Sequence, residues 1–214
     1  MENITNKPRY LILDTESGSC HSTSTLLTAY FMVTDDNFKV LGDLYLQLKP
    51  EPNEHYIVNA QGLGVNGINL VEHDKVSITC KQAKTLLYDF LKKHGSIDRL
   101  VPVGHATKGD IKRICDNLIS EGSWAQFCTY HFIDTSVVLQ FLRVCGKMPM
   151  DTDGSVESLA TYFANMDDNV NDKVVNLLLD GNLHDARIDV KLTALIFQQM
   201  IEVGNSQNTH NLKG

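Results

Sequence analysis

The sequence has no long apolar run, no CxxC pair and no excess of positive charge. No apolar segment reaches the roughly 18 residues that a membrane-spanning helix needs, so we expect no transmembrane segment. The first ten residues, MENITNKPRY, lack the apolar core of a signal peptide, which favours a cytoplasmic protein. The five cysteines are odd in number and argue against a disulfide framework or a zinc site. They predict small, buried core thiols in a reducing compartment.

The net charge of -7 argues against a protein that coats nucleic acid without specificity. It is compatible with an enzyme that acts on nucleic acid, because catalytic carboxylates add negative charge that bound metal neutralises. Repeats, low-complexity tracts and linkers are also missing. With 214 residues and 43% hydrophobic residues, the chain is expected to form one domain over 1–214, with its core at about 9–204.

Apolar patterning predicts three strands joined by short connections, then alternating helices and strands. We expect the strands of an antiparallel meander at 10–13, 26–34 and 38–48. Helical spacing and cap residues predict helices at 80–94, 108–119, 136–144, 155–163 and about 185–203, with Gly204 at the end of the last. Short strands are expected at 100–103 and 132–133, and Trp124 in a loop. This order indicates an α/β domain with a mixed sheet flanked by helices.

Two carboxylates end the first strand. Asp14 and Glu16 follow the apolar run Tyr10 to Leu13, and residues two apart on a strand point to the same face. Carboxylates this close repel each other unless a cation or a proton lies between them. Because hard oxygen ligands favour Mg²⁺ or Mn²⁺, the pair predicts a divalent-metal site.

Two later segments carry matching chemistry. Asp110 falls in the first turn of a helix that follows a strand, and Asp189 falls near the start of the last helix, with His184 just before it. Three elements could thus bring four carboxylates into one pocket, which suits two cations about 3.5–4 Å apart in phosphoryl transfer. A histidine there could take a proton from the attacking water.

Each motif is weak alone, since carboxylates are common on surfaces and His105 is more often a packed histidine. Their order and context are more specific. LDTESG at 13–18, VGHATKGD at 103–110 and HDARID at 184–189 resemble the motifs of the DEDDh exonucleases. This is the family of the proofreading subunit of bacterial replicative polymerase, ribonuclease T and oligoribonuclease. The resemblance covers about residues 9–200.

The resemblance implies a ribonuclease H-like fold with a five-stranded sheet, and removal of nucleoside 5′-monophosphates from single-stranded 3′ ends of DNA or RNA. By position, two Mg²⁺ or Mn²⁺ ions are expected on the four carboxylates, and His184 is the expected general base. The backbone N–H of Ser17, with Glu16, would meet the terminal hydroxyl. The segment around Asn66, a loop in the family, would lie against the last nucleotide. Thr15, Gly18 and His105 complete the predicted substrate-binding set.

Several features depart from the family pattern or leave alternatives open. Ala106 stands where the family usually has Asn, and Gly109 where it usually has a bulky residue. The basic residues Lys108, Lys112, Arg113, Arg143 and Lys147 suit either phosphate contacts or a solvated helix face. The alternatives to an active exonuclease are an inactive exonuclease fold that binds nucleic acid or docks a partner, and a related endonuclease. Relatives act alone, as homodimers or attached to polymerases, and the sequence leaves these three states open.

Overall fold

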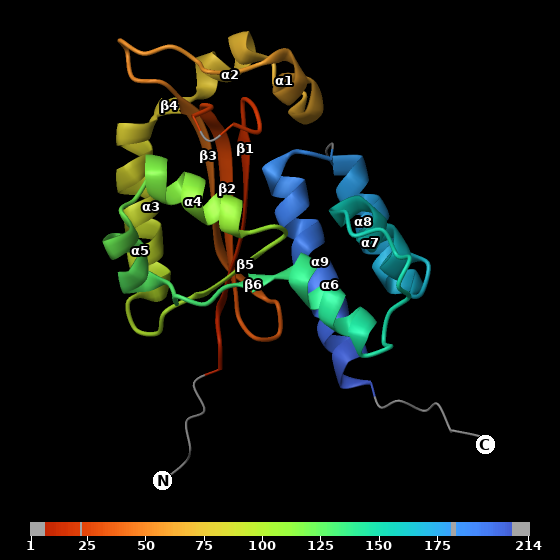
Figure 1. Ribbon diagram of the computed structural model, residues 1–214. Helices are drawn as coiled ribbons and strands as arrows, with labels where there is room; N and C mark the ends of the chain where they lie inside the picture. Colours follow the sequence, from red (N-terminus) through yellow and green to blue (C-terminus); the bar gives the residue numbers. More distant parts are fainter. Residues whose placement is uncertain (1–6, 22, 181–182, 207–214) are drawn as a thin grey trace, which may run out of the picture.

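The computed structural model describes residues 7–21, 23–180 and 183–206 (Figure 1). A mixed six-stranded sheet is flanked by helices on both faces. Its strands are β1 (Tyr10–Ser17), β2 (Leu26–Thr34), β3 (Val40–Lys49), β4 (Ile78–Thr79), β5 (Val101–Gly104) and β6 (Ile133–Asp134). The helices are α1 (Ala60–Asn66), α2 (Leu70–Val76), α3 (Cys80–Gly95), α4 (Lys108–Asn117), α5 (Glu121–Phe127), α6 (Thr135–Val144), α7 (Val156–Ala164), α8 (Asp168–Asp180) and α9 (Ala186–Asn205).

The strands lie in the order β4-β3-β2-β1-β5-β6. Strands β1, β2 and β3 pair antiparallel, which confirms the predicted meander, while β5 pairs parallel to β1 and β6 parallel to β5. The expected count of five strands is wrong, because two-residue strand β4 pairs with the end of β3. Residues Ile78 and Thr79 lie directly before helix α3, and so short a strand leaves no alternating pattern to read.

Strand β1 is buried on both faces, and its side chains alternate between two cores. Leu11 and Leu13 pack in a cluster with residues of α3, α4 and α5, whereas Ile12 packs on the opposite face with α9. This alternation follows from the two-residue period of a strand. It decides which side of the sheet each polar residue at the end of β1 faces.

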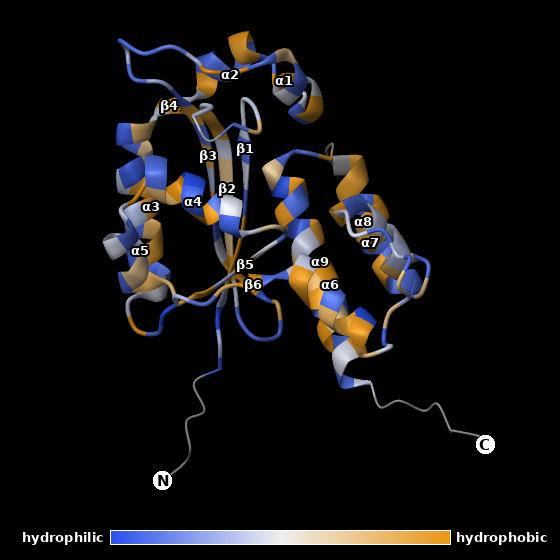
Figure 2. Ribbon diagram, viewed as in Figure 1, coloured by the Kyte–Doolittle hydropathy of each residue, from blue (hydrophilic) through white to orange (hydrophobic). Residues whose placement is uncertain are grey.

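The helices α6, α7, α8 and α9 form a further apolar cluster beside the sheet (Figures 1 and 2). Leu192, Ile196 and Met200 of α9 face this cluster, while Val190 and Phe197 face the sheet. In Figure 2, apolar residues alternate with polar ones along these helices, as expected for helices with one packed face. Helix α9 is thereby held from two sides, which supports its first turn at the carboxyl end of β1.

Four helices were not expected from the sequence: α1, α2, α5 and α8. The expected loop around Asn66 is wrong, because Ala60–Asn66 is a helix capped by Asn59 and ended by Gly67 at φ 65°. Trp124 is also not in a loop, since it lies in α5, where it is buried in the core. The last helix runs past Gly204 to Asn205. The four unexpected helices are short or polar, so a helical period of apolar residues is hard to recognise in their sequences.

The expectation of five buried cysteines is wrong for two of them. Cys128 is buried and Cys80 and Cys115 are partly buried, but Cys20 and Cys145 are exposed, and all five are free thiols. No helix among residues 7–21, 23–180 and 183–206 combines the length and the apolar character needed to cross a bilayer.

Candidate active site

Three consecutive residues at the end of β1 face opposite sides of the sheet. Asp14 and Glu16 continue the row of Ile12, toward the face that α9 covers, whereas Thr15 continues the row of Leu13, toward α4. The Thr15 hydroxyl accordingly donates a 2.5 Å hydrogen bond to Oδ1 of Asp110 on α4. Side chains at the end of β1 therefore face both α4 and α9, the two helices that carry the other carboxylates.

Asp110 is held on α4 by the turn that leaves β5. The side chain of Asp134 accepts hydrogen bonds from the backbone N–H groups of Ala106, at 3.0 Å, and Thr107, at 3.1 Å. Ala106 has φ 57°, a left-handed conformation that makes the turn sharp. A side chain at Gly104 would lie 3.0 Å from the carbonyl oxygen of Leu13, so glycine is needed where β5 passes β1. Asp110 is thus fixed in the first turn of α4 and is only 6% exposed.

Asp189 is placed by the first turn of α9. Asp185 caps this helix by accepting a hydrogen bond from the N–H of Arg187, which agrees with the predicted helix start at about residue 185. His184 precedes the cap at φ 63°, and this left-handed residue turns the chain into the helix. One ligand atom each of Glu16, His184 and Asp189 lies within 4.8 Å of the others. The structure therefore brings the first and third motifs together.

Burial and mutual repulsion raise the pKa values of the carboxyl groups on β1. Burial, followed by repulsion from Asp110, Glu16 and Asp189, raises the pKa of Asp14 well above its ordinary value. Burial, followed by repulsion from Asp189 and Asp110, raises the pKa of Glu16 to about 8. In the absence of a cation, these groups therefore tend to hold protons at neutral pH.

The pKa values of the two carboxyl groups on helices, Asp110 and Asp189, are raised less. Burial raises the pKa of Asp110 to about 6, and this rise is limited by the hydrogen bond from Thr15 and by the charge of Arg113. Burial raises the pKa of Asp189 to about 6 as well, limited by the charge of His184. Asp110 thus has a hydrogen-bonding partner on β1 and a positive charge on α4, whereas Asp189 has the positive charge of the residue that precedes its helix cap.

This arrangement fits divalent cations. Oδ2 of Asp14 is shielded from solvent and has no hydrogen-bond partner within the described part of the chain. Unpartnered buried oxygens are rare, since they forfeit the hydrogen bonds of water without replacement. A hard cation would satisfy that oxygen and remove the repulsion among all four carboxylates. The predicted ligand set is therefore compatible with Mg²⁺ or Mn²⁺.

A cavity of about 260 Å³ opens beside the carboxylates. It lies between the end of β1 and α1, which pack together at two glycines. A Cβ at Gly62 would lie 2.3 Å from the carbonyl oxygen of Gly18. A larger residue at position 62 would therefore prevent α1 from packing this closely against the end of β1. The Asn66 side chain donates a 3.2 Å hydrogen bond to the carbonyl oxygen of Ser17. The cavity is lined by Thr15, Glu16, Ser17, Ser19, Cys20, Asn59, Gln61, Gly62, Val65, Asn66 and Arg113.

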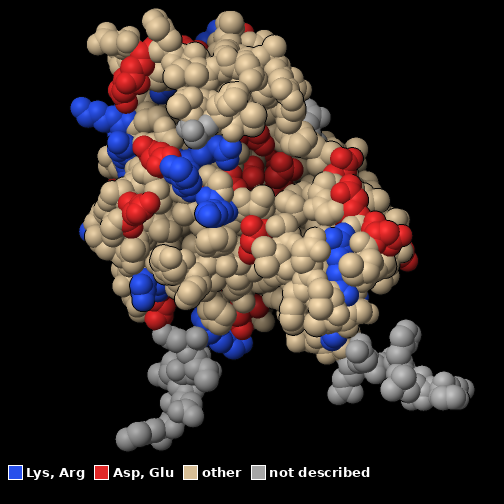
Figure 3. Space-filling view, in the orientation of Figure 1, with Lys and Arg blue, Asp and Glu red and all other residues tan. Residues whose placement is uncertain are grey.

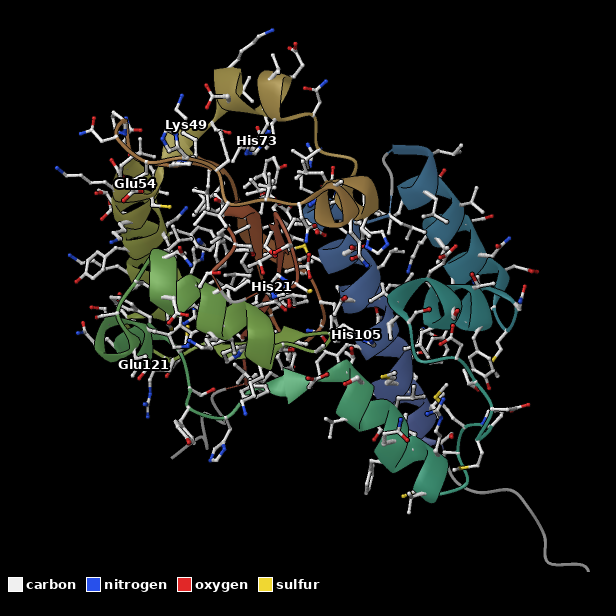
Figure 4. The ribbon with its side chains drawn as sticks, turned by 45° about the horizontal axis from the view of Figure 1, so that its top comes forward. His21, Lys49, Glu54, His73, His105 and Glu121 are labelled. Carbon is white, nitrogen blue, oxygen red and sulfur yellow. The ribbon has the colours of Figure 1, made fainter. Side chains whose placement is uncertain are left out.

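The predicted substrate-binding residues differ in their positions. Thr15, Ser17 and Asn66 line the cavity, whereas Gly18 does not line it and its carbonyl oxygen packs against Gly62 of α1. His105 is not among the lining residues. Its Nδ1 lies 2.9 Å from the hydroxyl of Thr135, and Figure 4 shows it near the start of α6.

Figure 3 shows acidic side chains in a hollow between α4 and α9, beneath α1, with basic side chains beside it over α4. Not all predicted phosphate-binding cations are available to a ligand. Arg143 donates to the carbonyl of Thr152, and Lys147 donates to the carbonyls of Val203, Gly204 and Ser206. Lys112 pairs with Asp116 at 2.6 Å.

One wall of the cavity is formed by α1, which was not predicted from the sequence. Gln61, Gly62 and Val65 line the cavity from this helix. An asparagine cap at 59 and a glycine at 67 are start and stop signals that predict a short helix between them.

No family model matches the sequence, and no curated protein matches it significantly. Solved structures do match. E. coli exonuclease I bound to a dT13 oligonucleotide aligns with 91% of this chain and 41% of its own, at 16% identity and a TM-score of 0.68. A zinc-bound form of its complex with single-stranded DNA aligns with 93% of this chain and 41% of its own, at 14% identity and a TM-score of 0.65.

Cell-death related nuclease 4 aligns with 92% of this chain and 65% of its own, at 16% identity and a TM-score of 0.64. The chain thus spans about two fifths of the length of the exonuclease I chains, for example 41% in the complex with dT13. At these identities the likeness concerns the fold. The chain therefore has the ribonuclease H-like fold shared by these exonucleases, and its three motifs resemble those of the DEDDh group.

Proposed function

We propose that the protein is a metal-dependent 3′–5′ exonuclease that shortens single-stranded DNA or RNA and releases nucleoside 5′-monophosphates. The observation that carries the proposal is the approach of Glu16, His184 and Asp189 to within 4.8 Å, beside the unpartnered oxygen of Asp14. The likeness to exonuclease I, which has been solved with single-stranded oligonucleotides, supports the substrate class. The chain would act as one exonuclease domain.

Asp14, Glu16, Asp110 and Asp189 would hold two Mg²⁺ or Mn²⁺ ions. When bound, such ions stabilise the negative charge that develops on the phosphodiester. The chain supplies the remaining functions. Thr15 fixes the orientation of Asp110 through their hydrogen bond. A deprotonated ring nitrogen of His184 would accept the proton of the attacking water, which forms a bond to phosphorus as the bond to the 3′ oxygen of the penultimate nucleotide breaks.

The cavity beside Glu16 has the position that a terminal nucleotide requires. It adjoins the carboxylates, so a nucleotide inside it would present its 5′ phosphate to them. Glu16 and the backbone N–H of Ser17 would receive the terminal 3′ hydroxyl. Asn66 would support this contact, because its side chain holds the Ser17 carbonyl. Because α1 and the end of β1 bound the cavity, a 3′ end rather than an internal position would be the favoured substrate.

The test uses matched DNA and RNA oligonucleotides labelled at the 5′ end, incubated with Mg²⁺ or Mn²⁺, with Asp14→Ala as the control. A ladder that shortens from the 3′ end, and that the variant does not produce, is the expected result. Internal fragments would identify an endonuclease instead. Intact oligonucleotides with a folded protein would favour an inactive fold that binds nucleic acid or docks a partner.

A further inference from the structure

Arg113 is the one cation among the described residues that line the cavity beside Glu16. The other lining side chains are neutral, apart from Glu16 itself. The arginine lies on α4, three residues after Asp110, and this spacing places both side chains on the same face of the helix. A positive charge therefore faces the proposed nucleotide cavity from the helix that also carries a carboxylate.

Gly109 leaves the space that the Arg113 side chain occupies. A Cβ at position 109 would lie 3.3 Å from an Nη atom of Arg113, and a larger side chain would meet the guanidinium directly. The arginine is half-buried, with its side chain 29% exposed. The glycine and the arginine are thus a spatial pair, and the small residue lets the long one lie along the helix toward the site.

The donors of this guanidinium are largely unused. Its Nη1 forms an ion pair with Oδ1 of Asp110 at 3.7 Å, a separation that is longer than a hydrogen bond. The same Oδ1 already accepts the short hydrogen bond from Thr15. Throughout residues 7–21, 23–180 and 183–206, the guanidinium donates no hydrogen bond to the protein. A planar fork of N–H donors is therefore available at the cavity wall.

From this geometry we propose that Arg113 binds the 5′ phosphate of the terminal nucleotide, the phosphate that leaves with the nucleoside monophosphate. The inference rests on the proposed function, since it assumes that this cavity holds the nucleotide. A phosphate entering here meets the carboxylates of Glu16 and Asp110, so a nearby cation offsets their repulsion. The guanidinium fork also matches two phosphate oxygens at once, which a lysine cannot do.

The experiment measures dissociation constants for thymidine 5′-monophosphate and for thymidine, in the presence of Mg²⁺. The unmodified chain is compared with Arg113→Ala and with Lys112→Ala. Lys112→Ala is the matched control, because it removes the same charge from the adjacent residue on α4. The Lys112 side chain pairs with Asp116 and does not line the cavity. Neither ligand is consumed, so the binding measurement is independent of turnover.

We expect Arg113→Ala to weaken monophosphate binding by about ten- to a hundredfold, since a hydrogen bond to a charged group contributes roughly 1.5–3 kcal/mol. Thymidine binding and both constants of Lys112→Ala should change less than about twofold. Unchanged monophosphate binding in Arg113→Ala would overturn the inference, as would an equal loss for both ligands. If the unmodified chain binds neither ligand, the proposed function fails along with the inference.

A second measurement separates phosphate binding from an indirect effect through Asp110. The Mg²⁺ concentration that gives half of the rise in thermal midpoint should not be higher in Arg113→Ala than in the unmodified chain. A large increase in that concentration would mean that the arginine acts by positioning Asp110, which would overturn the inference. Arg113→Lys should keep the Mg²⁺ response and restore only part of the monophosphate affinity, because a single ammonium replaces the fork.

Discussion

The helices α4 and α9 both deliver a carboxylate from their first turn, yet they build the two halves of the site differently. On the α4 side, Asp110 is 6% exposed, accepts a hydrogen bond from Thr15 and faces Arg113. On the α9 side, His184 is exposed and left-handed. No side chain within the described residues donates a hydrogen bond to Glu16 or Asp189. Side-chain partners hold the first half, whereas in the second half Asp189 is supported by the charge and the backbone of His184.

This difference indicates a division of labour. The α4 half has internal partners for its charge, so its geometry is set before any ligand arrives. The α9 half keeps the group with the pKa of about 8, Glu16, next to Asp189 and His184. Such a cluster is satisfied only when a cation or protons neutralise it. Catalysis and metal dependence should therefore be most sensitive on the α9 side, and structural preorganisation on the α4 side.

The largest effect is expected from the carboxylates themselves. Asp14→Ala and Asp189→Ala should each lower turnover by about a thousandfold or more, because lost cation ligation forfeits several kcal/mol of transition-state stabilisation. Both variants should fold, since removing one carboxylate relieves repulsion among the rest. Steady-state rates and circular dichroism check the two halves of this prediction. Normal turnover in either variant would refute the assignment of the site.

His184→Ala should lower turnover by roughly 10²–10⁴-fold, the usual contribution of a general base. The thermal shift produced by Mg²⁺ should persist, because the carboxylates remain. Since His184 is exposed, added imidazole should restore part of the rate. A rate equal to that of the unmodified chain would show that another group accepts the proton.

The metal-free protein should lose stability as the pH rises from about 4.5 to about 8. The folded state raises the pKa of Glu16 to about 8 from an ordinary value of 4.5. Folding therefore favours the protonated form of Glu16. The stabilisation that results is complete below the ordinary pKa of the group and is lost as the pH rises through its pKa in the folded state. The expected loss is a few kcal/mol, or a fall in thermal midpoint of roughly 5–10 °C.

Thermal scans with a chelator, over that pH range, measure this loss. Glu16→Gln should flatten the dependence, and Mg²⁺ should restore the midpoint of the unmodified chain at pH 8. A midpoint that stays constant without metal between these pH values would contradict the electrostatic account of the α9 half.

The smallest effect is expected on the α4 side. Thr15→Val removes the hydrogen bond that lowers the pKa of Asp110, so that pKa should rise above its present value of about 6. The acid limb of the pH–rate profile should move to higher pH by about one unit. Thr34→Val is the matched control, because the Thr34 hydroxyl is also buried on a strand but has no hydrogen-bond partner within the described part of the chain. A shift of equal size in both variants would exclude a specific role of Thr15.

Much of the fold was predictable because its central elements repeat simple patterns. The strand at 26–34 is buried along its whole length, and its β-branched and aromatic residues favour a strand. Helix α3 shows clear helical spacing and a capping box of Thr79 and Gln82. By contrast, α1 and α2 are seven residues each and bury almost nothing, so their sequences carry little period. Caps, rather than hydrophobicity, define them.

By itself, the sequence determined the chemistry of the site: its carboxylates, the histidine, and the facing of Asp14 and Glu16 to one side of a strand. Only the tertiary structure decided which groups meet. Thr15 and Asp110 are in contact although 95 positions separate them in the sequence. Glu16 and Asp189 meet because α9 packs against the sheet at the end of β1. The place of Arg113 in the cavity wall likewise depends on how α4 packs against β1 and α1. Local periodicity sets the direction of a side chain, whereas long-range packing sets its neighbours.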